Sequence, residues 1–166
     1  NIINPTATIQ NSYTLCDYDD VINLSASNLD PNSQIIWSTS SLFLDTLNNA
    51  NVSSISVSPN QDTWYYIKVN NGNCNFIDST IVNVSIGSLQ IIGDSILCYG
   101  DSMLIIAETF QHPDSVNFTF SPDSITLSNF QNDSVWFMFT ENNTIFVTVS
   151  DPISGCTLSD SIYISV

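Results

Sequence analysis

The four cysteines of this 166-residue chain are spaced as two copies of one pattern. Cys16 and Cys74 are 58 positions apart, and Cys98 and Cys156 are also 58 apart. Each member of the first pair is displaced by 82 positions from its counterpart in the second. Equal spacing at a fixed offset indicates an internal repeat, which predicts two similar domains.

Residues around the cysteines follow the same offset. The sequence Cys-Asn-Phe-Ile-Asp-Ser at 74–79 matches Cys-Thr-Leu-Ser-Asp-Ser at 156–161, and Leu15 matches Leu97. The change from one copy to the next falls near Gly87. We therefore expect one domain at 1–86 and a second at 87–166, joined by a very short linker that limits the angles between them.

The cysteines also predict a disulfide arrangement. Four cysteines can pair in three ways. The repeat favours one bond inside each copy, Cys16–Cys74 and Cys98–Cys156, and closing such a loop would contribute about 4 kcal/mol in the chain-entropy model. Zinc is the alternative, but Cys-x-x-Cys spacing is absent and the only histidine, His112, is not close to a cysteine in sequence. Disulfide bonds imply an oxidising compartment, so we expect an extracellular or secreted protein.

The hydrophobic pattern is that of strands throughout. β-Branched and aromatic residues alternate with Ser, Thr and Asn, and turn clusters recur about every ten positions. In the first copy this predicts strands near 6–10, 21–26, 34–38, 54–58, 64–69 and 80–86. Six or seven short strands per copy predict an all-β fold of two tandem immunoglobulin-like sandwiches, each closed at one end by its intradomain disulfide.

Charge excludes several classes of partner. Lys68 is the only basic residue, there is no arginine, and 16 acidic residues give a formal net charge of −15. Binding to nucleic acid or to an anionic membrane surface requires clustered Lys or Arg. No apolar stretch approaches the length that crosses a bilayer, so direct membrane insertion is not expected either.

We find no constellation of residues that predicts an enzyme. A serine triad or a cysteine–histidine pair needs a base beside its nucleophile, and His112 lies in a loop. Paired carboxylates for glycoside hydrolysis would have to come from aspartate-rich turns without an evident pocket. The sequence therefore predicts a non-catalytic protein that needs no cofactor.

Calcium is the one metal that the sequence suggests. Asp17, Asp19 and Asp20 cluster beside Cys16, and oxygen-rich turns are where calcium binds. The second copy keeps only Asp101 at these positions. A solvated acidic turn is therefore favoured over a calcium site.

Two groups of outward side chains are candidate binding surfaces. On the strand at 64–69, Tyr65, Ile67 and Val69 are expected to face the core, which leaves Trp64 and Tyr66 outward as a possible platform for stacking a sugar.

In the second copy we expect an apolar patch at four outward positions, Met103, Ile105, Trp136 and Met138, which could contact another surface protein. The first copy has Val, Asn, Ser and Ser at the corresponding positions. A register shifted by one residue would bury these four side chains instead.

Several short motifs together resemble a known family. They are Cys-x-x-Asp at 16–19, Val-Ser-Pro at 57–59, Thr-Trp-Tyr-Tyr-Ile-Lys-Val at 63–69 and Asn-Gly-Asn-Cys at 71–74. Each copy resembles the Ig-like or PKD-like repeats of large surface and secreted proteins in Bacteroidota, which often precede a gliding-motility-associated or type IX secretion domain. The second copy departs from the pattern, with no tryptophan on its third strand and Phe139-Thr140 in place of Ser58-Pro59.

The resemblance implies a role rather than a ligand. Such repeats act as structural or adhesive spacers, with neighbouring repeats of the same parent chain as their first partners. The alternative is a carbohydrate-binding or other ligand-binding accessory module of a secreted enzyme.

Overall fold

The chain divides into two compact units, Asn1–Val84 and Ser85–Val166. The computed structural model describes residues 5–47, 51–72, 74–111, 116–122 and 133–166, and every regular element in those ranges is a β-strand. No helix in these ranges is long and apolar enough to cross a membrane. The boundary between the units follows Val84. The repeat in the sequence predicted it two residues later, after residue 86.

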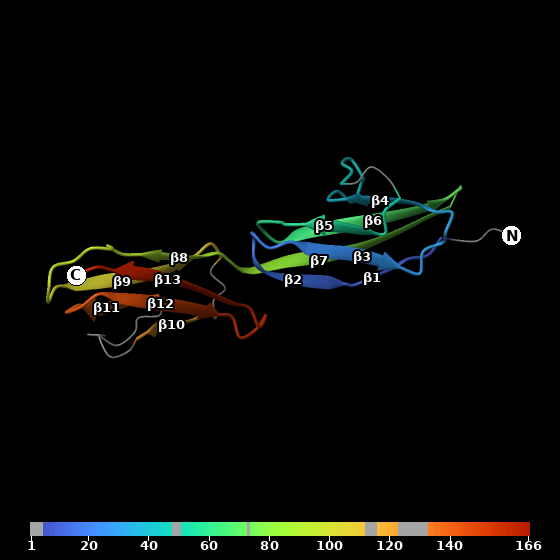
Figure 1. Cartoon of the computed structure of the whole chain (residues 1–166). Coiled ribbons are helices and arrows are strands. Elements are labelled where there is room, and N and C mark those ends of the chain that lie inside the picture. The colour runs from blue at the N-terminus through green and yellow to red at the C-terminus, as the bar shows by residue number, and fades with distance from the viewer. Residues whose placement is uncertain (1–4, 48–50, 73, 112–115, 123–132) are drawn as a thin grey trace. The chain divides into compact units, whose positions relative to one another are not determined.

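The first unit is a two-layer sandwich (Figure 1). Its three-stranded sheet has the order β1-β3-β5, from β1 (Thr8–Ile9), β3 (Ile22–Ser27) and β5 (Ser54–Val57). Its four-stranded sheet has the order β2-β7-β6-β4, from β2 (Ser12–Asp17), β7 (Cys74–Gly87), β6 (Thr63–Asn71) and β4 (Gln34–Ser38).

Alternating side chains of the two sheets form the core of the first unit. On β6, Tyr65, Ile67 and Val69 are buried, and Trp64 is exposed on the opposite face. This alternation confirms the prediction from the sequence, because successive side chains of a strand point to opposite faces. Trp37 on β4 lies at the centre of the same core and has no exposed surface.

One strand of the first unit was not expected. β2 follows β1 after only two residues, Gln10 and Asn11. The chain changes sheets at this point, because β1 pairs with β3 whereas β2 lies beside β7. Cys16 is therefore part of a strand, although it lies outside the strands predicted from the sequence near 6–10 and 21–26.

The second unit repeats the two-layer architecture. One sheet has the order β11-β9-β8, from β11 (Ser134–Met138), β9 (Ser102–Thr109) and β8 (Leu89–Ile92). The other has the order β10-β12-β13, from β10 (Asn117–Ser121), β12 (Asn143–Ser150) and β13 (Thr157–Ile164).

Phenylalanines fill the core of the second unit. Phe120, Phe137 and Phe139 are all buried, and the ring of Phe137 lies 6.4 Å from that of Phe120 and 6.1 Å from that of Phe139 between centroids. These spacings are within the range of favourable aromatic pairs. The second core thus contains no tryptophan among its buried residues, in contrast to the first.

Candidate interaction surface and cysteine positions

Apolar side chains are concentrated on the outer face of the β8-β9-β11 sheet. Residues directly opposite each other on antiparallel strands share a face. Trp136 lies opposite Leu104, and Ile92 lies opposite Ile106. With Met138 at the end of β11, these residues define what we call the Trp136 face: Ile92, Leu104, Ile106, Trp136 and Met138.

Three of these five side chains are exposed. Trp136 is 45% exposed, Met138 is 43% exposed and Ile92 is 40% exposed, while Leu104 and Ile106 are partly buried between them. Contiguous exposed apolar surface of this kind is typical of contact sites. The Trp136 face is therefore the main candidate for an interaction surface in the described part of the chain.

Two of the four positions that the sequence predicted to be outward are exposed in the structure. Trp136 and Met138 point outward as expected, but the outward placement of Met103 and Ile105 was wrong, because both are buried. Met103 lies opposite the core residue Phe137, so it shares the inner face. The outward residues of β9 are instead its even-numbered ones.

Acidic residues border the Trp136 face at both ends. Asp101 immediately precedes β9 at the end that carries Met138, and it is exposed. Glu108 is the next residue after Ile106 on the outer face of β9, and it is exposed. Asp133, whose carbonyl accepts a hydrogen bond from the amide of Ala107 at 2.7 Å, is exposed at that same end. The apolar surface therefore has a negatively charged border.

The corresponding surface of the first unit is polar. On β3 and β5 the outward pairs are Asn23 with Ser56 and Ser25 with Ser54, and all four are exposed. The Ser56 hydroxyl lies 2.6 Å from Oδ1 of Asn23 and donates to it. The apolar outer face is thus a property of the second copy and not of the repeat.

The two outward aromatic residues of β6 lie on a mixed surface. Trp64 is 49% exposed and lies opposite Ile81, while Tyr66 is partly buried and lies opposite Ser79. Their side chains are two positions apart on one face. Of the two rings of the predicted stacking platform, that of Trp64 is therefore half-exposed and that of Tyr66 is partly buried.

The single basic side chain lies on the same sheet. The Nζ atom of Lys68 lies 5.7 Å from the centre of the Phe43 ring, in a cation–π contact. The positive charge of Lys68 therefore lies against an aromatic ring of the same unit.

The acidic turn after β2 is held together by hydrogen bonds between its own residues. The amide of Asp19 donates to Oδ1 of Asp17 at 2.9 Å, and the amide of Asp20 donates to the carbonyl of Asp17 at 3.2 Å. No group of three His, Cys, Asp or Glu side chains is placed to hold a metal within the described ranges. His112, the histidine considered for catalysis, lies outside those ranges.

The two cysteines of the first unit lie at opposite ends of its sandwich. Cys16 precedes the turn that leads into β3, whereas Cys74 pairs with Asn71 in the β6–β7 hairpin. The side-chain amide of Asn71 donates to Oδ2 of Asp30 at 2.8 Å, and Asp30 lies three residues after the end of β3. The six residues of β3, about 20 Å, therefore separate Cys16 from Cys74.

The chain comes into the first unit at the Cys74 end. The Thr6 hydroxyl donates to the carbonyl of Asn28, just after β3, at 3.2 Å. β7 begins at Cys74 and carries the chain away toward Gly87. We call the end of a unit where the chain comes in its upstream end, and the end where the chain leaves its downstream end. Cys74 is at the upstream end and Cys16 at the downstream end.

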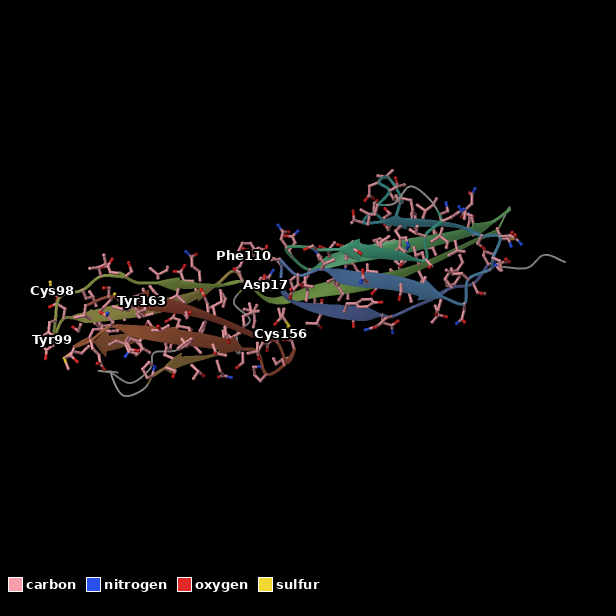
Figure 2. All side chains as sticks on the ribbon, in the orientation of Figure 1. Asp17, Cys98, Tyr99, Phe110, Cys156 and Tyr163 are labelled. Atoms are coloured by element: carbon pink, nitrogen blue, oxygen red, sulfur yellow. The ribbon has the colours of Figure 1, made fainter. Side chains whose placement is uncertain are left out.

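The second unit has the same arrangement. Cys156 immediately precedes β13, whereas the neighbour of Cys98, Leu97, donates its amide to the carbonyl of Ser165 just after β13, at 2.9 Å. The eight residues of β13, about 26 Å, lie between them. Figure 2 shows Cys98 and Cys156 at opposite ends of this unit, and Ser165 places Cys98 at the downstream end.

The predicted disulfide pairing is therefore wrong. A disulfide requires Cα atoms within about 7 Å, so neither Cys16–Cys74 nor Cys98–Cys156 can form. Cys16 and Cys156 are each disulfide-bonded in the structure, while Cys74 and Cys98 are free thiols. The equal spacing of 58 residues reflects the repeat and not a pairing inside each copy.

Asp151 organises the turn that carries Cys156. Its Oδ2 accepts a hydrogen bond from the Ser85 hydroxyl at 2.7 Å, and its Oδ1 accepts one from the amide of Ile153 at 2.9 Å. Its own amide donates to the carbonyl of Cys156 at 2.9 Å. Hydrogen bonds from the Ser154 and Ser85 side chains lower the pKa of Asp151 to about 2. The turn thereby holds Ser85, the first residue of the second unit, at the upstream end.

Replacing Asp151 with asparagine should destabilise the second unit near neutral pH and have progressively less effect in acid. The folded pKa lies below the ordinary value of 3.8, so the carboxylate stabilises the fold above that value and loses this contribution as the pH falls to about 2. Urea unfolding of both proteins between pH 2 and pH 7 measures the difference. The exposed Asp94→Asn is the control. A difference that does not change with pH would contradict the role of the carboxylate.

The comparisons with known proteins identify the fold. No known protein family model matches the chain, and no curated protein matches it in sequence. Among solved structures, extracellular domains 3–5 of Drosophila OTK are 12% identical with a TM-score of 0.51, covering 97% of this chain and 62% of theirs. The titin I-band fragment I67–I69 is 9% identical with a TM-score of 0.52, covering 100% and 66%.

A third structure leads to the same conclusion. Immunoglobulin domains 1–4 of Sidekick-1 are 9% identical with a TM-score of 0.52, covering 98% of this chain and 48% of theirs. The chain spans less than two thirds of the length of these three structures. The similarity shows an immunoglobulin-like fold, which confirms the all-β, immunoglobulin-like class predicted from the sequence, whereas the predicted intradomain disulfides are wrong.

Proposed function

We propose that this chain is a non-catalytic adhesive and spacer segment of an extracellular protein, and that it makes its adhesive contact through the Trp136 face. The observation that carries the proposal is the concentration of five apolar side chains on one outer sheet face of the second unit. Two disulfide-bonded cysteines support an oxidising location. The immunoglobulin-like fold supplies two stable sandwiches on which such a face can be displayed.

The charge of the chain determines what kind of partner fits this face. Asp101, Glu108 and Asp133 border it, and the whole chain carries a net charge of −15. An acidic border repels a second acidic surface and attracts a basic one. The partner is therefore a protein with an apolar centre surrounded by Lys and Arg.

Selection from a random peptide library against the whole chain tests this proposal. We expect the enriched peptides to have an aromatic or aliphatic centre flanked by Lys or Arg. Their affinity should fall at least tenfold for the Trp136→Ser/Met138→Ser variant and should weaken with added salt. Trp64→Ser, which removes an equally exposed tryptophan from the first unit, is the matched control. Peptides that bind the double variant as tightly as the unchanged chain would refute the assignment.

The biological setting follows from the family that the sequence resembles. We propose that the parent is a surface or secreted protein of the Bacteroidota type, exported with a type IX secretion or gliding-motility-associated domain, and that neighbouring repeats are its nearest partners. The supporting features are the motif Cys-x-x-Asp at 16–19 and the strand at 63–69. A parent sequence with further repeats of about 80 residues is expected, whereas an adjoining catalytic domain would favour an accessory module.

Carbohydrate binding is the second candidate, and the exposed ring of Trp64 is the observation that favours it. Sugars stack on exposed aromatic faces, and Tyr66 lies on the same face of β6. A pull-down on insoluble polysaccharides separates the two candidates, because retention that is lost in Trp64→Ser but kept in Trp136→Ser would support carbohydrate binding.

A further inference from the structure

The outer face of the β10-β12-β13 sheet is uncharged and rich in hydroxyl groups. β12 is the middle strand (Figure 1), and its odd-numbered residues 145–149 are buried, so its even-numbered residues face outward. We call this surface the hydroxyl face: the even-numbered residues 144–150 of β12, with their cross-strand partners, the odd-numbered residues 117–121 of β10 and 157–163 of β13. All of them except Asn117 and Phe146 are Ser, Thr or Tyr, and none is charged, although the chain has a net charge of −15.

Two aromatic rings project from the hydroxyl face. Phe146 is 56% exposed and Tyr163 is 57% exposed. Phe146 lies directly opposite Ser161 on β13, and Tyr163 is two residues further along β13. The two aromatic residues are therefore diagonal neighbours, about 7–8 Å apart. One ligand can contact both rings.

Hydroxyl groups stand on both sides of the Phe146 ring. Ser121 of β10 lies opposite Phe146 on one side and Ser161 of β13 lies opposite it on the other, and both serines are exposed. In the next row the Thr148 and Ser159 hydroxyls are hydrogen-bonded at 2.9 Å. A hydroxyl can both donate and accept a hydrogen bond. The ring is thus bordered by groups that can bond to a hydroxylated ligand.

The equivalent face of the first unit has a different composition. On the outer side of β6 and β7, Lys68 lies opposite Ile77, and Trp64 lies opposite Ile81. Ile77 is exposed, so this surface combines a charge with aliphatic groups. The uncharged hydroxyl face is therefore a property of the second unit.

The composition of the hydroxyl face determines the class of ligand that fits it. A pyranose ring with equatorial hydroxyls has an apolar face of C–H groups and a rim of hydroxyls. The apolar face can stack on an aromatic ring, and the rim can bond to neighbouring Ser and Thr. A protein partner needs an apolar centre, which two separate rings among Ser and Thr do not supply. An anionic polysaccharide would be repelled by the acidic chain and would find no base on this face.

We propose that the hydroxyl face binds a neutral polysaccharide of the β-glucan type. One pyranose stacks on Phe146 and bonds through its hydroxyls to Ser121 and Ser161, and a second pyranose of the same glucan stacks on Tyr163. This site is on the second unit, apart from Trp64, and on the opposite sheet from the Trp136 face. It can therefore be present or absent independently of both surfaces.

Affinity electrophoresis of the whole chain in native gels that contain mixed-linkage β-glucan tests the proposal. The unchanged chain should be retarded, and Phe146→Ala and Tyr163→Ala should each weaken the affinity at least fivefold. Both side chains are more than half exposed, so both variants should stay folded, which circular dichroism checks. Thr157→Ala, on the same face but two rows from Phe146, is the matched control and should keep the affinity.

Salt and a charged polymer test the neutral character of the ligand. Retention of the chain on microcrystalline cellulose, a β-glucan, should be the same at about 0.05 M and about 0.5 M salt, since no charge pair is involved. Polygalacturonate gels should not retard the chain. Retention that falls with salt, or retardation by polygalacturonate, would overturn the assignment to a neutral glucan.

The remaining outcomes separate this site from the other two surfaces. The proposal is refuted if the unchanged chain is not retarded by β-glucan, or if the Phe146→Ala/Tyr163→Ala variant is retarded as strongly as the unchanged chain. Loss of retardation in Trp64→Ser alone would place the sugar site on the first unit instead. The double variant should still bind the peptides selected on the Trp136 face. If it lost those peptides and kept the glucan, the hydroxyl face would be a protein contact.

Discussion

Replacing Trp37 with alanine is expected to unfold the first unit under conditions in which the second remains folded. Trp37 has no exposed surface, and its indole Nε1 donates to the carbonyl of Val52 at 3.1 Å. Truncating a buried aromatic side chain costs about 3–5 kcal/mol, because both the buried area and the packing around it are lost. That cost is a large share of the stability of a small domain, about 5–15 kcal/mol.

Hydrogen exchange measured by mass spectrometry resolves this effect along the chain. Protection should be lost in β4 and β6 and kept in β9 and β12 at moderate urea concentrations. Trp64→Ala is the control, because it removes the same residue type from a half-exposed position of the same unit, and it should change the stability by less than about 1 kcal/mol. Equal effects of the two substitutions would show that Trp37 is not the centre of the core.

Replacing Phe137 with alanine is expected to destabilise the second unit by a similar amount, about 3–5 kcal/mol. Phe137 is completely buried, and its ring packs against those of Phe120 and Phe139 at 6.4 and 6.1 Å between centroids. Its removal leaves a cavity between two aromatic neighbours. Urea unfolding with hydrogen exchange as the readout should show the loss in β9 and β12 while β4 and β6 keep their protection.

The neighbouring residue on the same strand provides the control. Trp136 is larger than Phe137 but is 45% exposed on the opposite face of β11, so Trp136→Ala should cost less than about 1 kcal/mol. The pair also tests the register of β11 against β9. If Trp136→Ala were the more damaging substitution, the two faces of β11 would have been assigned the wrong way round.

The sequence allowed the faces of β6 to be predicted because only one of its faces is consistently buried. Tyr65, Ile67 and Val69 alternate with Trp64 and Lys68, and the side-chain period of a strand is two. On β9 both faces are apolar, since Met103 and Ile105 alternate with Leu104 and Ile106. A period of two cannot then decide which set is inward.

The register of β9 with its neighbours made that decision. Met103 lies opposite Phe137 and therefore faces the core, and Leu104 lies opposite Trp136 and therefore faces outward. The sequence indicated outward apolar residues on β11 correctly, but Ile92, Leu104 and Ile106 could be added to the surface only once the cross-strand pairs were known. For Leu104 and Ile106, the signal in the sequence is the doubly apolar pattern of β9.

The sequence by itself determined the repeat, the all-β class and the inward face of β6, because each of these follows from spacing or periodicity along the chain. Only the tertiary structure decided which cysteines can pair. Cys16 and Cys74, like Cys98 and Cys156, are 58 residues apart in both copies, yet β3 and β13 hold the members of each pair at opposite ends of a sandwich. Separation in sequence measures a length of chain, whereas a covalent bond depends on distance in space, and that distance is fixed by the direction in which each strand crosses its sheet.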